Sequence, residues 1–281
     1  MNSIKRIGII GNGAVGLLMA SLLADDYEVT VYGRNISSPD ERLSITRTGM
    51  TNGSAHVSLK SSETLQETDE DIFFVTTKAH QVEGATERLT GKVPVFICSN
   101  GIAHLDYAKR RGFHLGIVEH GVTKSRGGIE HRGLGRIRIG SSTGLPPIQI
   151  KESPLQLVWE EDIEQVVIEK LFANAIINPI TALCRVPNGA LVNSPYREIA
   201  QSIYRELTPL FPQQVPYTYI ESIIASTAEN RSSMLRDIEE GRPTEVDAIL
   251  KPVIEKAALT QNSLTVIPLL HKLIIGASAS C

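Results

Sequence analysis

Three polar side chains recur at four-residue spacing in a segment that is otherwise apolar. Lys170, Asn174 and Asn178 occupy positions i, i+4 and i+8 in the run EKLFANAIINP (169–179). On a helix this spacing places all three on one face, and the apolar neighbours predict that the helix is buried. Buried amide and ammonium groups need polar partners, which a ligand-filled cleft provides. Apolar surroundings also lower the pKa of a lysine, which suits a general acid near neutral pH. The alternative is a polar face turned to water.

A second group of polar residues lies further along the chain, at residues 231–247. The segment RSSMLRDIEEGRPTEVD predicts a helix end, a Gly-Arg-Pro-Thr turn and a new helix, with Thr244 as an N-cap. Glu245 would then lie in the first turn of that helix. By pattern alone, Glu245 is a favourable charge at the positive end of the helix dipole.

Residues 11–16 read GNGAVG and match the pattern G-x-G-x-x-G. The motif follows a β-branched run at 4–10, opens a helix-forming run at 15–24 and precedes the strand-like YEVTVY at 27–32. In such a β–α–β unit the glycines allow a tight turn and close approach of a pyrophosphate to the helix N-terminus. The context favours a dinucleotide site over a glycine-rich turn without a ligand.

The residues after the next strands indicate which dinucleotide binds. The second strand ends in Tyr-Gly-Arg-Asn, so Arg34 stands where an NAD enzyme usually has an acidic residue. Because a guanidinium forks well onto a phosphate, Arg34 favours NADP, and Lys78 after the apolar run at 72–76 adds a second charge. Asn100 follows another strand and suits contact with a ribose or a substrate oxygen. The alternatives are that Arg34 and Lys78 are solvated surface cations, and that Asn100 and Gly101 only form a turn that tolerates positive φ.

The elements that position these residues fall into two regions. Strand and helix patterns alternate up to about residue 140, including a hairpin at 45–59, a helix after Lys78 that reaches about Leu89, and an antiparallel ribbon at 121–140. Beyond about residue 160 the sequence is mostly helical. We therefore predict an α/β protein: a Rossmann-type doubly wound domain at 1–150, then an all-helical domain at 151–281.

Composition excludes several classes of protein. The chain has 281 residues, 42% hydrophobic and 21% charged, with a net charge of −3, so no global basic field invites nucleic acid. The basic segment 121–138 lacks interleaved aromatic residues and contains Glu130. The sequence contains no run of about 18 uncharged apolar residues, so we expect no membrane span. Glycines interrupt the N-terminal apolar stretch, which favours a buried strand over a signal peptide. The three cysteines are far apart in sequence, which predicts a cytoplasmic protein without disulfides. The sequence contains no cluster of metal-ligating residues, so we expect no metal site.

Several motifs together resemble the ketopantoate reductase (2-dehydropantoate 2-reductase) family. They are GNGAVG, TTKAHQ (76–81), SNG (99–101), KLFANAIINPITAL (170–183), VPNGAL (186–191) and SSMLRDIEEGRPTEVD (232–247). The similarity runs in order from residue 4 to about residue 275. The lysine–asparagine and serine–glutamate motifs are far more specific than the glycine fingerprint.

The resemblance implies NADPH-dependent reduction of 2-dehydropantoate, a 2-oxo acid, to (R)-pantoate in pantothenate biosynthesis, with closure of two domains around both ligands. It implies that Lys170 donates the proton, that Asn100 lies where cofactor and substrate meet, and that Glu245 acts near the nicotinamide ribose. The substrate would be lined by Asn174, Asn178, Asn188 and Ser233. The cofactor would be held by Gly11, Asn12, Gly13, Ala14, Val15, Gly16, Arg34, Lys78, Asn100, the backbone at Val122, and Glu245. The family also suggests a homodimer.

The sequence departs from the family pattern at a few points. Leu250-Lys251 stand where the family commonly has Asn-Gly, and the segment after Gly121 is more basic than usual. The first departure bears on substrate choice. Two other hypotheses therefore stay open: an NADP-linked reductase of another 2-oxo acid, and a non-catalytic NADPH-binding sensor, which would have no need of the lysine–asparagine stripe.

Overall fold

The computed structural model describes residues 4–34, 36, 41–65, 69–125 and 127–279. The chain divides into two compact units, residues 1–164 and 165–281. The predicted boundary at residue 150 falls within the first unit, because the segment after the Pro-rich turn at 144–147 adds a further strand to the sheet. Each unit is described by itself below.

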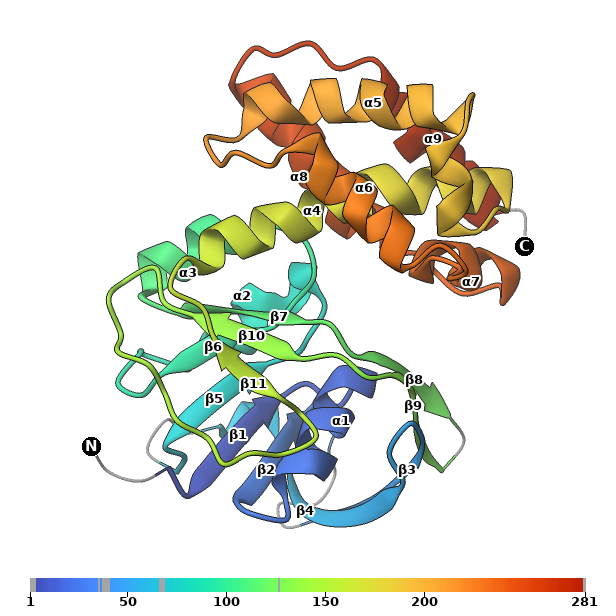
Figure 1. Cartoon of the computed structure of the whole chain (residues 1–281). Coiled ribbons are helices and arrows are strands. Elements are labelled where there is room, and N and C mark those ends of the chain that lie inside the picture. Colours follow the sequence, from blue (N-terminus) through green and yellow to red (C-terminus); the bar gives the residue numbers. More distant parts are fainter. Residues whose placement is uncertain (1–3, 35, 37–40, 66–68, 126, 280–281) are drawn as a thin grey trace. The chain divides into compact units, whose positions relative to one another are not determined.

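The first unit is built on one mixed sheet of eleven described strands (Figure 1). The order across the sheet is β11-β10-β7-β6-β5-β1-β2-β4-β3-β9-β8. Strands β4–β2–β1–β5–β6–β7 are mutually parallel, and the β3–β4, β8–β9 and β7–β10 pairs are antiparallel. The strands are β1 (Arg6–Ile10), β2 (Glu28–Gly33), β3 (Glu41–Gly49), β4 (Gly53–Ser61), β5 (Ile72–Val75), β6 (Val95–Ile97), β7 (His114–Val118), β8 (Gly121–Ser125), β9 (Gly128–Gly133), β10 (Ile137–Gly140) and β11 (Leu157–Trp159).

Helix α1 (Ala14–Leu23) links β1 to β2 and is buried along most of its length. It packs on β1–β4 and also contacts β8 and β9 (Figure 1). The chain steps one way across the sheet from β1 to β2 and the other way from β5 to β7. Right-handed crossovers then place α1 on one face and the later helices on the other, as the predicted doubly wound fold requires.

Two predicted elements differ from the structure. In place of one helix reaching Leu89 there are a 3₁₀ turn, η2 (Ala79–Gln81), and a single helical turn, α2 (Val82–Ala85). Thr86 is the C-cap residue of this helix, and its hydroxyl bonds the Val82 carbonyl at 2.8 Å and lies 2.8 Å from the hydroxyl of Tyr107. The ribbon predicted at 121–140 ends with β9, because β10 pairs with β7. Two further short helices are η1 (Ser62–Thr64) and α3 (Leu105–Arg111).

The second unit is helical throughout its described residues. Its elements are α4 (Ile163–Cys184, whose first two residues belong to the first unit), η3 (Asn188–Val192), α5 (Tyr196–Leu207), η4 (Thr208–Leu210), α6 (Tyr217–Ser226), α7 (Ser233–Glu239), α8 (Val246–Leu259) and α9 (Val266–Ala279).

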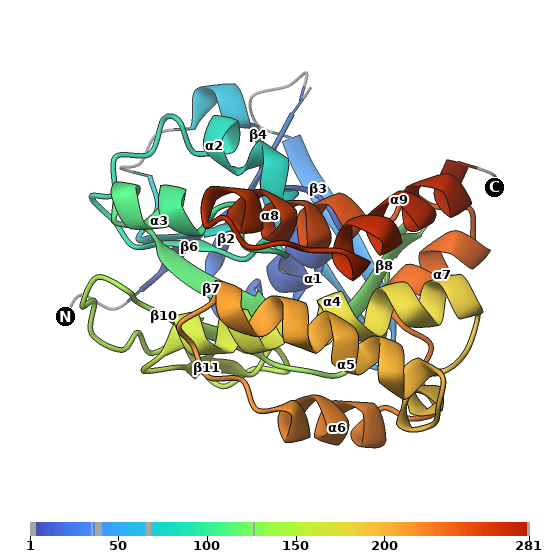
Figure 2. The same ribbon diagram turned by 90° about the horizontal axis from the view of Figure 1, so that it is seen from above.

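Helix α4 carries much of the apolar core of this unit. The ring of Phe172 lies edge-on to Tyr204 and Phe211, with centroids 6.0 and 5.9 Å away. Helices α8 and α9 run side by side (Figures 1 and 2). The carboxylate of Glu206 in α5 accepts the backbone N–H groups of Thr265, Val266 and Ile267 and so fixes the start of α9.

Candidate functional site

Four adjacent parallel strands end at one edge of the sheet, and each is followed by predicted site residues. In sheet order these strands are β6, β5, β1 and β2. Because the carboxyl ends of parallel strands meet at the same edge, Asn100, Lys78, the loop at 11–16 and Arg34 come together there. The reversal of strand order at β1 and β5 makes this edge the switch point, where doubly wound sheets bind ligands.

The glycine loop fits a closely approaching phosphate. Gly11 has φ +121°, and a Cβ on it would lie 2.8 Å from Thr76 Oγ1. A Cβ on Gly16 would lie 2.0 Å from the Gly11 carbonyl oxygen. Gly13 differs, because a Cβ there would have no atom within 4 Å. The loop is thus closed against the protein at Gly11 and Gly16 and open at Gly13.

The N-terminus of α1 suits an anion. Gly13 is its N-cap, no side chain caps the helix, and no acidic residue lies in its first turn. The first N–H groups of a helix have no partner within the helix and carry a partial positive charge. Ala14 and Val15 contribute these groups, so this end of α1 is suited to a pyrophosphate.

Two cations at the same edge are suited to further phosphate contacts. Arg34 and Lys78 are exposed, and neither has a carboxylate partner among the residues that the structure describes. Asn12, the second residue of the glycine loop, has its amide against Gly33, where a Cβ would lie 3.0 Å from Nδ2. The remaining cofactor residue of the prediction, Val122, packs against the apolar core that includes α1.

Asn100 is half-buried just beyond β6. The preceding residue, Ser99, donates a hydrogen bond of 2.6 Å to the Thr77 carbonyl, which joins the loops after β5 and β6. Gly101 has φ +82°, so the turn itself accounts for an Asn-Gly pair here. A ligand contact by Asn100 stays a prediction.

In the second unit, α4 presents the predicted polar stripe. Lys170 and Asn174 are half-buried, and Asn178 is only 6% exposed. No hydrogen-bond partner for the side-chain amides of Asn174 and Asn178 occurs among the described residues. Neither amide is completely buried, so both stay open to solvent. Binding of a ligand by this stripe stays a prediction.

Asn188 and Ser233 are placed differently. The Asn188 amide donates to Thr227 Oγ1 at 3.0 Å, and its Oδ1 is buried without a partner among the described residues. Ser233 is exposed at the first position of α7. The preceding Ser232, absent from the predicted site, caps α7 and lies 2.8 Å from Thr181 Oγ1 on α4. The sequence feature that could have predicted the role of Ser232 is the preference of serine for the N-cap position, since a Ser-Ser pair stands at the start of this helix.

Glu245 occupies the N-cap position of α8, one residue later than the predicted cap at Thr244. Its side chain is half-buried and does not cap the helix. Arg242 holds the preceding turn, because its guanidinium bonds Asp237 Oδ1 at 2.8 and 3.0 Å. Leu250, at the position of the family departure, is fully buried in α8.

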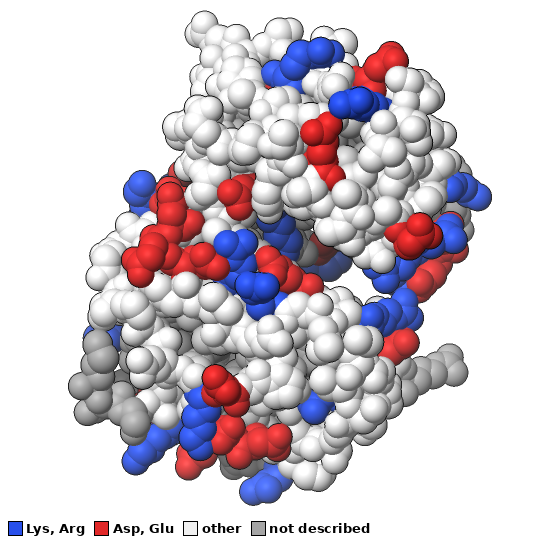
Figure 3. Space-filling view, viewed as in Figure 1, with Lys and Arg blue, Asp and Glu red and all other residues white. Residues whose placement is uncertain are grey.

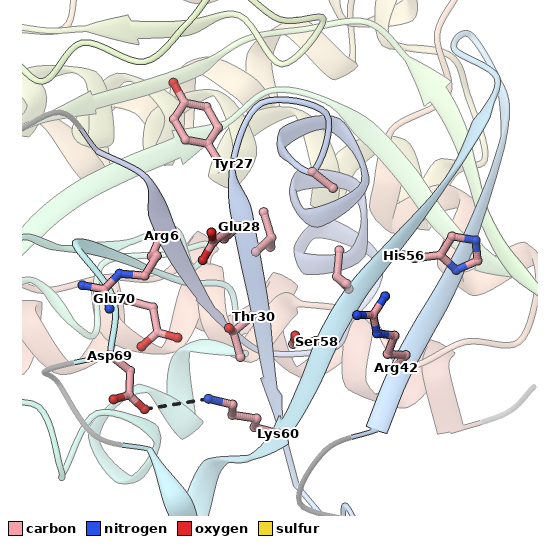
Figure 4. A pocket seen from close by; sticks show the side chains of 13 residues that line it. Arg6, Tyr27, Glu28, Thr30, Arg42, His56, Ser58, Lys60, Asp69 and Glu70 are labelled. Atoms are coloured by element: carbon pink, nitrogen blue, oxygen red, sulfur yellow. Dashed lines mark ion pairs between the residues drawn. The ribbon is translucent and has the colours of Figure 1, made fainter.

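A separate polar pocket of about 550 Å³ lies on the sheet (Figure 4). It is lined by the first residues of β1 and β2, Arg6 and Glu28, and thus lies away from the carboxyl ends of these strands. Its charges are mixed, with an ion pair of 3.8 Å between Lys60 and Asp69 (Figure 4). Burial raises the pKa of Glu70 in its wall. This pocket is distinct from the edge that carries the glycine loop.

Surface and membrane features are unexceptional. On the face shown in Figure 3, acidic and basic side chains are interspersed rather than gathered into one patch. Helix α4 has the length and composition of a membrane span. The sequence analysis predicted no span here because it required an uncharged run, and Lys170 interrupts this one. However, 78% of its most apolar window is buried inside the protein, as in an ordinary core helix. Among the described residues, no group of three or more His, Cys, Asp or Glu side chains could hold a metal.

Comparison with known proteins confirms the resemblance seen in the motifs. Residues 7–144 match the family described as ketopantoate reductase PanE/ApbA, and residues 162–277 match its C-terminal domain. The 2-dehydropantoate 2-reductase of Bacillus subtilis (strain 168) is 33% identical over 274 residues, covering 90% of this chain and 91% of the relative.

Solved structures agree with this assignment. The crystal structure of probable 2-dehydropantoate 2-reductase panE from Bacillus subtilis has a TM-score of 0.86 at 29% identity, covering 97% of this chain and 99% of that one. The ternary structure of D-mandelate dehydrogenase with NADH and anilino(oxo)acetate shares the fold, with a TM-score of 0.77 at 17% identity and 98% coverage of both chains. The chain therefore belongs to the ketopantoate reductase family of oxidoreductases.

Proposed function

We propose that this protein reduces 2-dehydropantoate to (R)-pantoate with NADPH, as a step of pantothenate synthesis. The observation that carries the proposal is the stripe on α4, where Lys170 and two asparagines without described amide partners lie on an otherwise buried helix. A non-catalytic sensor would have no use for this stripe. The second support is the glycine loop, whose geometry suits a dinucleotide. This agrees with the family, which is described as ketopantoate reductase.

The residues of the first unit would hold the cofactor. The N–H groups at the start of α1 bind the pyrophosphate, and Gly13 leaves room for its approach. Arg34 and Lys78 bind the 2′-phosphate, which distinguishes NADP from NAD, and Asn100 contacts the nicotinamide ribose. The chemistry that a bound reduced nicotinamide supplies is hydride donation to the C2 carbonyl carbon of the substrate.

The residues of the second unit would bind the substrate and handle the proton. Lys170, as an ammonium group, donates a hydrogen bond to the C2 carbonyl oxygen, stabilises the negative charge that develops there, and delivers its proton. Asn174 and Asn178 orient the 2-oxo acid, and Ser233 and Asn188 contribute to its binding. Glu245 acts near the nicotinamide ribose.

The test of the catalytic assignment is the Lys170→Ala variant. We expect kcat to fall at least about a hundredfold, because a general acid contributes 10²- to 10⁴-fold, while NADPH binding survives. The matched control is Lys272→Ala, which removes an exposed lysine of α9 and should leave kcat unchanged. Unchanged turnover in Lys170→Ala would refute the role of Lys170.

The notable departure from the family pattern keeps one alternative in the test: reduction of another 2-oxo acid. Leu250 is fully buried at the position where the family commonly has a polar residue. NADPH oxidation at 340 nm with 2-dehydropantoate and a panel of other 2-oxo acids separates the two. A kcat/KM for 2-dehydropantoate that dominates the panel supports the main proposal. Comparable values for several acids would refute it, and parallel assays with NADH test the role of Arg34.

A further inference from the structure

Lys124 lies beside the glycine loop although it is 112 residues away in sequence. Its Nζ donates a hydrogen bond of 3.4 Å to the backbone carbonyl of Asn12. The residue belongs to β8, in the basic segment whose arginines Arg132, Arg136 and Arg138 form ion pairs with glutamates. Strand β8 contacts α1 directly.

The fold fixes this placement through the ribbon formed by β8 and β9. Strand β9 pairs in parallel with β3, and a Cβ on Gly128 would lie 2.1 Å from the Thr46 carbonyl oxygen, so the two backbones approach as closely as a glycine allows. Alternate residues of a strand point to the same face. Val122, two residues before Lys124, packs on the core that includes α1, so Lys124 lies on the same side of β8.

The electrostatics of this position favour an anionic ligand. The start of α1 carries partial positive charge, and a cation near such an end is unfavourable by itself. Lys124 is exposed, and no carboxylate among the described residues forms an ion pair with it. An anion bound at the helix start would reverse the sign of the interaction. One ammonium donor contacts Asn12, and two remain for such a ligand.

We propose that Lys124 binds the pyrophosphate of the dinucleotide and thereby supplements the helix N-terminus. The assignment rests on the proposed function, since it presumes that the loop holds a nicotinamide dinucleotide. The pyrophosphate is favoured over the 2′-phosphate because Nζ contacts the carbonyl of Asn12, directly before Gly13 at the start of α1. Arg34, which suits the 2′-phosphate, follows the neighbouring strand β2.

The experiment measures dissociation constants of NADPH and NADH by fluorescence titration for the wild type and the Lys124→Gln, Lys124→Arg and Lys124→Glu variants. For Lys124→Gln we expect both constants to rise about three- to tenfold, with their ratio unchanged, because both dinucleotides carry the pyrophosphate. Lys124→Arg retains the wild-type affinity for both dinucleotides, and Lys124→Glu loses affinity for both by more than about tenfold. The difference in dissociation constant between the wild type and Lys124→Gln becomes smaller at high salt, because salt screens a charge contact that is exposed to solvent.

The control is Lys109→Gln, which removes an exposed lysine of α3 and should leave both constants unchanged. Wild-type affinity in Lys124→Gln would overturn the inference while leaving the proposed function intact. A loss confined to NADPH would overturn it in favour of the 2′-phosphate. A loss matched by a lower Tm of the ligand-free variant would assign Lys124 a structural role. Failure of the wild type to bind either dinucleotide would overturn both proposals.

Discussion

Replacing Asn178 by leucine should make the protein more stable and less active. The side chain is 6% exposed, and no described residue bonds its amide. A completely buried amide without a partner costs about 1–3 kcal/mol, and the partly hydrated amide of Asn178 carries only a part of that cost, which an apolar side chain of similar size avoids. We expect the ligand-free Asn178→Leu variant to gain up to about 1 kcal/mol, which corresponds to a rise in Tm of up to about 2–4 °C.

The same substitution removes the hydrogen bonds that we propose between Asn178 and the substrate. Two such bonds, at about 0.5–1.5 kcal/mol each, correspond to a fall in kcat/KM of about 5- to 160-fold. The assays are thermal unfolding of the ligand-free protein and steady-state reduction of 2-dehydropantoate. The opposite changes in stability and activity are the signature of a polar group held in place for a ligand.

A matched control is Thr181→Val. Thr181 lies on the same helix and is fully buried, but its hydroxyl lies 2.8 Å from both the Ile177 carbonyl oxygen and Ser232 Oγ. The valine variant should lose about 0.5–1.5 kcal/mol of stability rather than gain it. If Asn178→Leu is also destabilised while its kcat/KM stays within twofold of the wild type, Asn178 is a structural residue and the binding surface on α4 is refuted.

Two further predictions concern stability. Glu206→Gln should cost about 1–3 kcal/mol in urea unfolding, because the carboxylate accepts three N–H groups at the start of α9 and an amide has only one oxygen to replace it. Burial lowers the pKa of His104, His114 and His131, that of His104 to about 4, so the unfolded chain binds more protons below pH 6.5. The stability contributed by these neutral histidines is complete above about pH 6.5 and falls toward pH 4. Urea midpoints at pH 7.5, 6 and 4.5 should fall accordingly, and less steeply in His104→Leu; equal slopes would contradict this origin.

Local patterns predicted the parts of the fold that depend on neighbours in sequence. The apolar run at 72–75 became β5, and the alternating segment around residue 50 became the β3–β4 hairpin. Where tertiary contacts decide, the pattern failed. The helix after Lys78 stops at Ala85, where Thr86 contacts the distant Tyr107, and the short strand β11 is defined by its pairing with β10.

The candidate site divides in the same way. The stripe on α4 could be predicted because helical spacing alone places Lys170, Asn174 and Asn178 on one face. Lys124 could not, because its position depends on β9 lying beside β3 in one particular register, and no periodicity in residues 121–133 encodes the partner strand. A one-residue slip in that register would turn alternate side chains to the other face. Gly128 lies so close to Thr46 that a slip bringing Ile129 to this position would clash, and this backbone constraint therefore contributes to the register that places Lys124 beside the glycine loop.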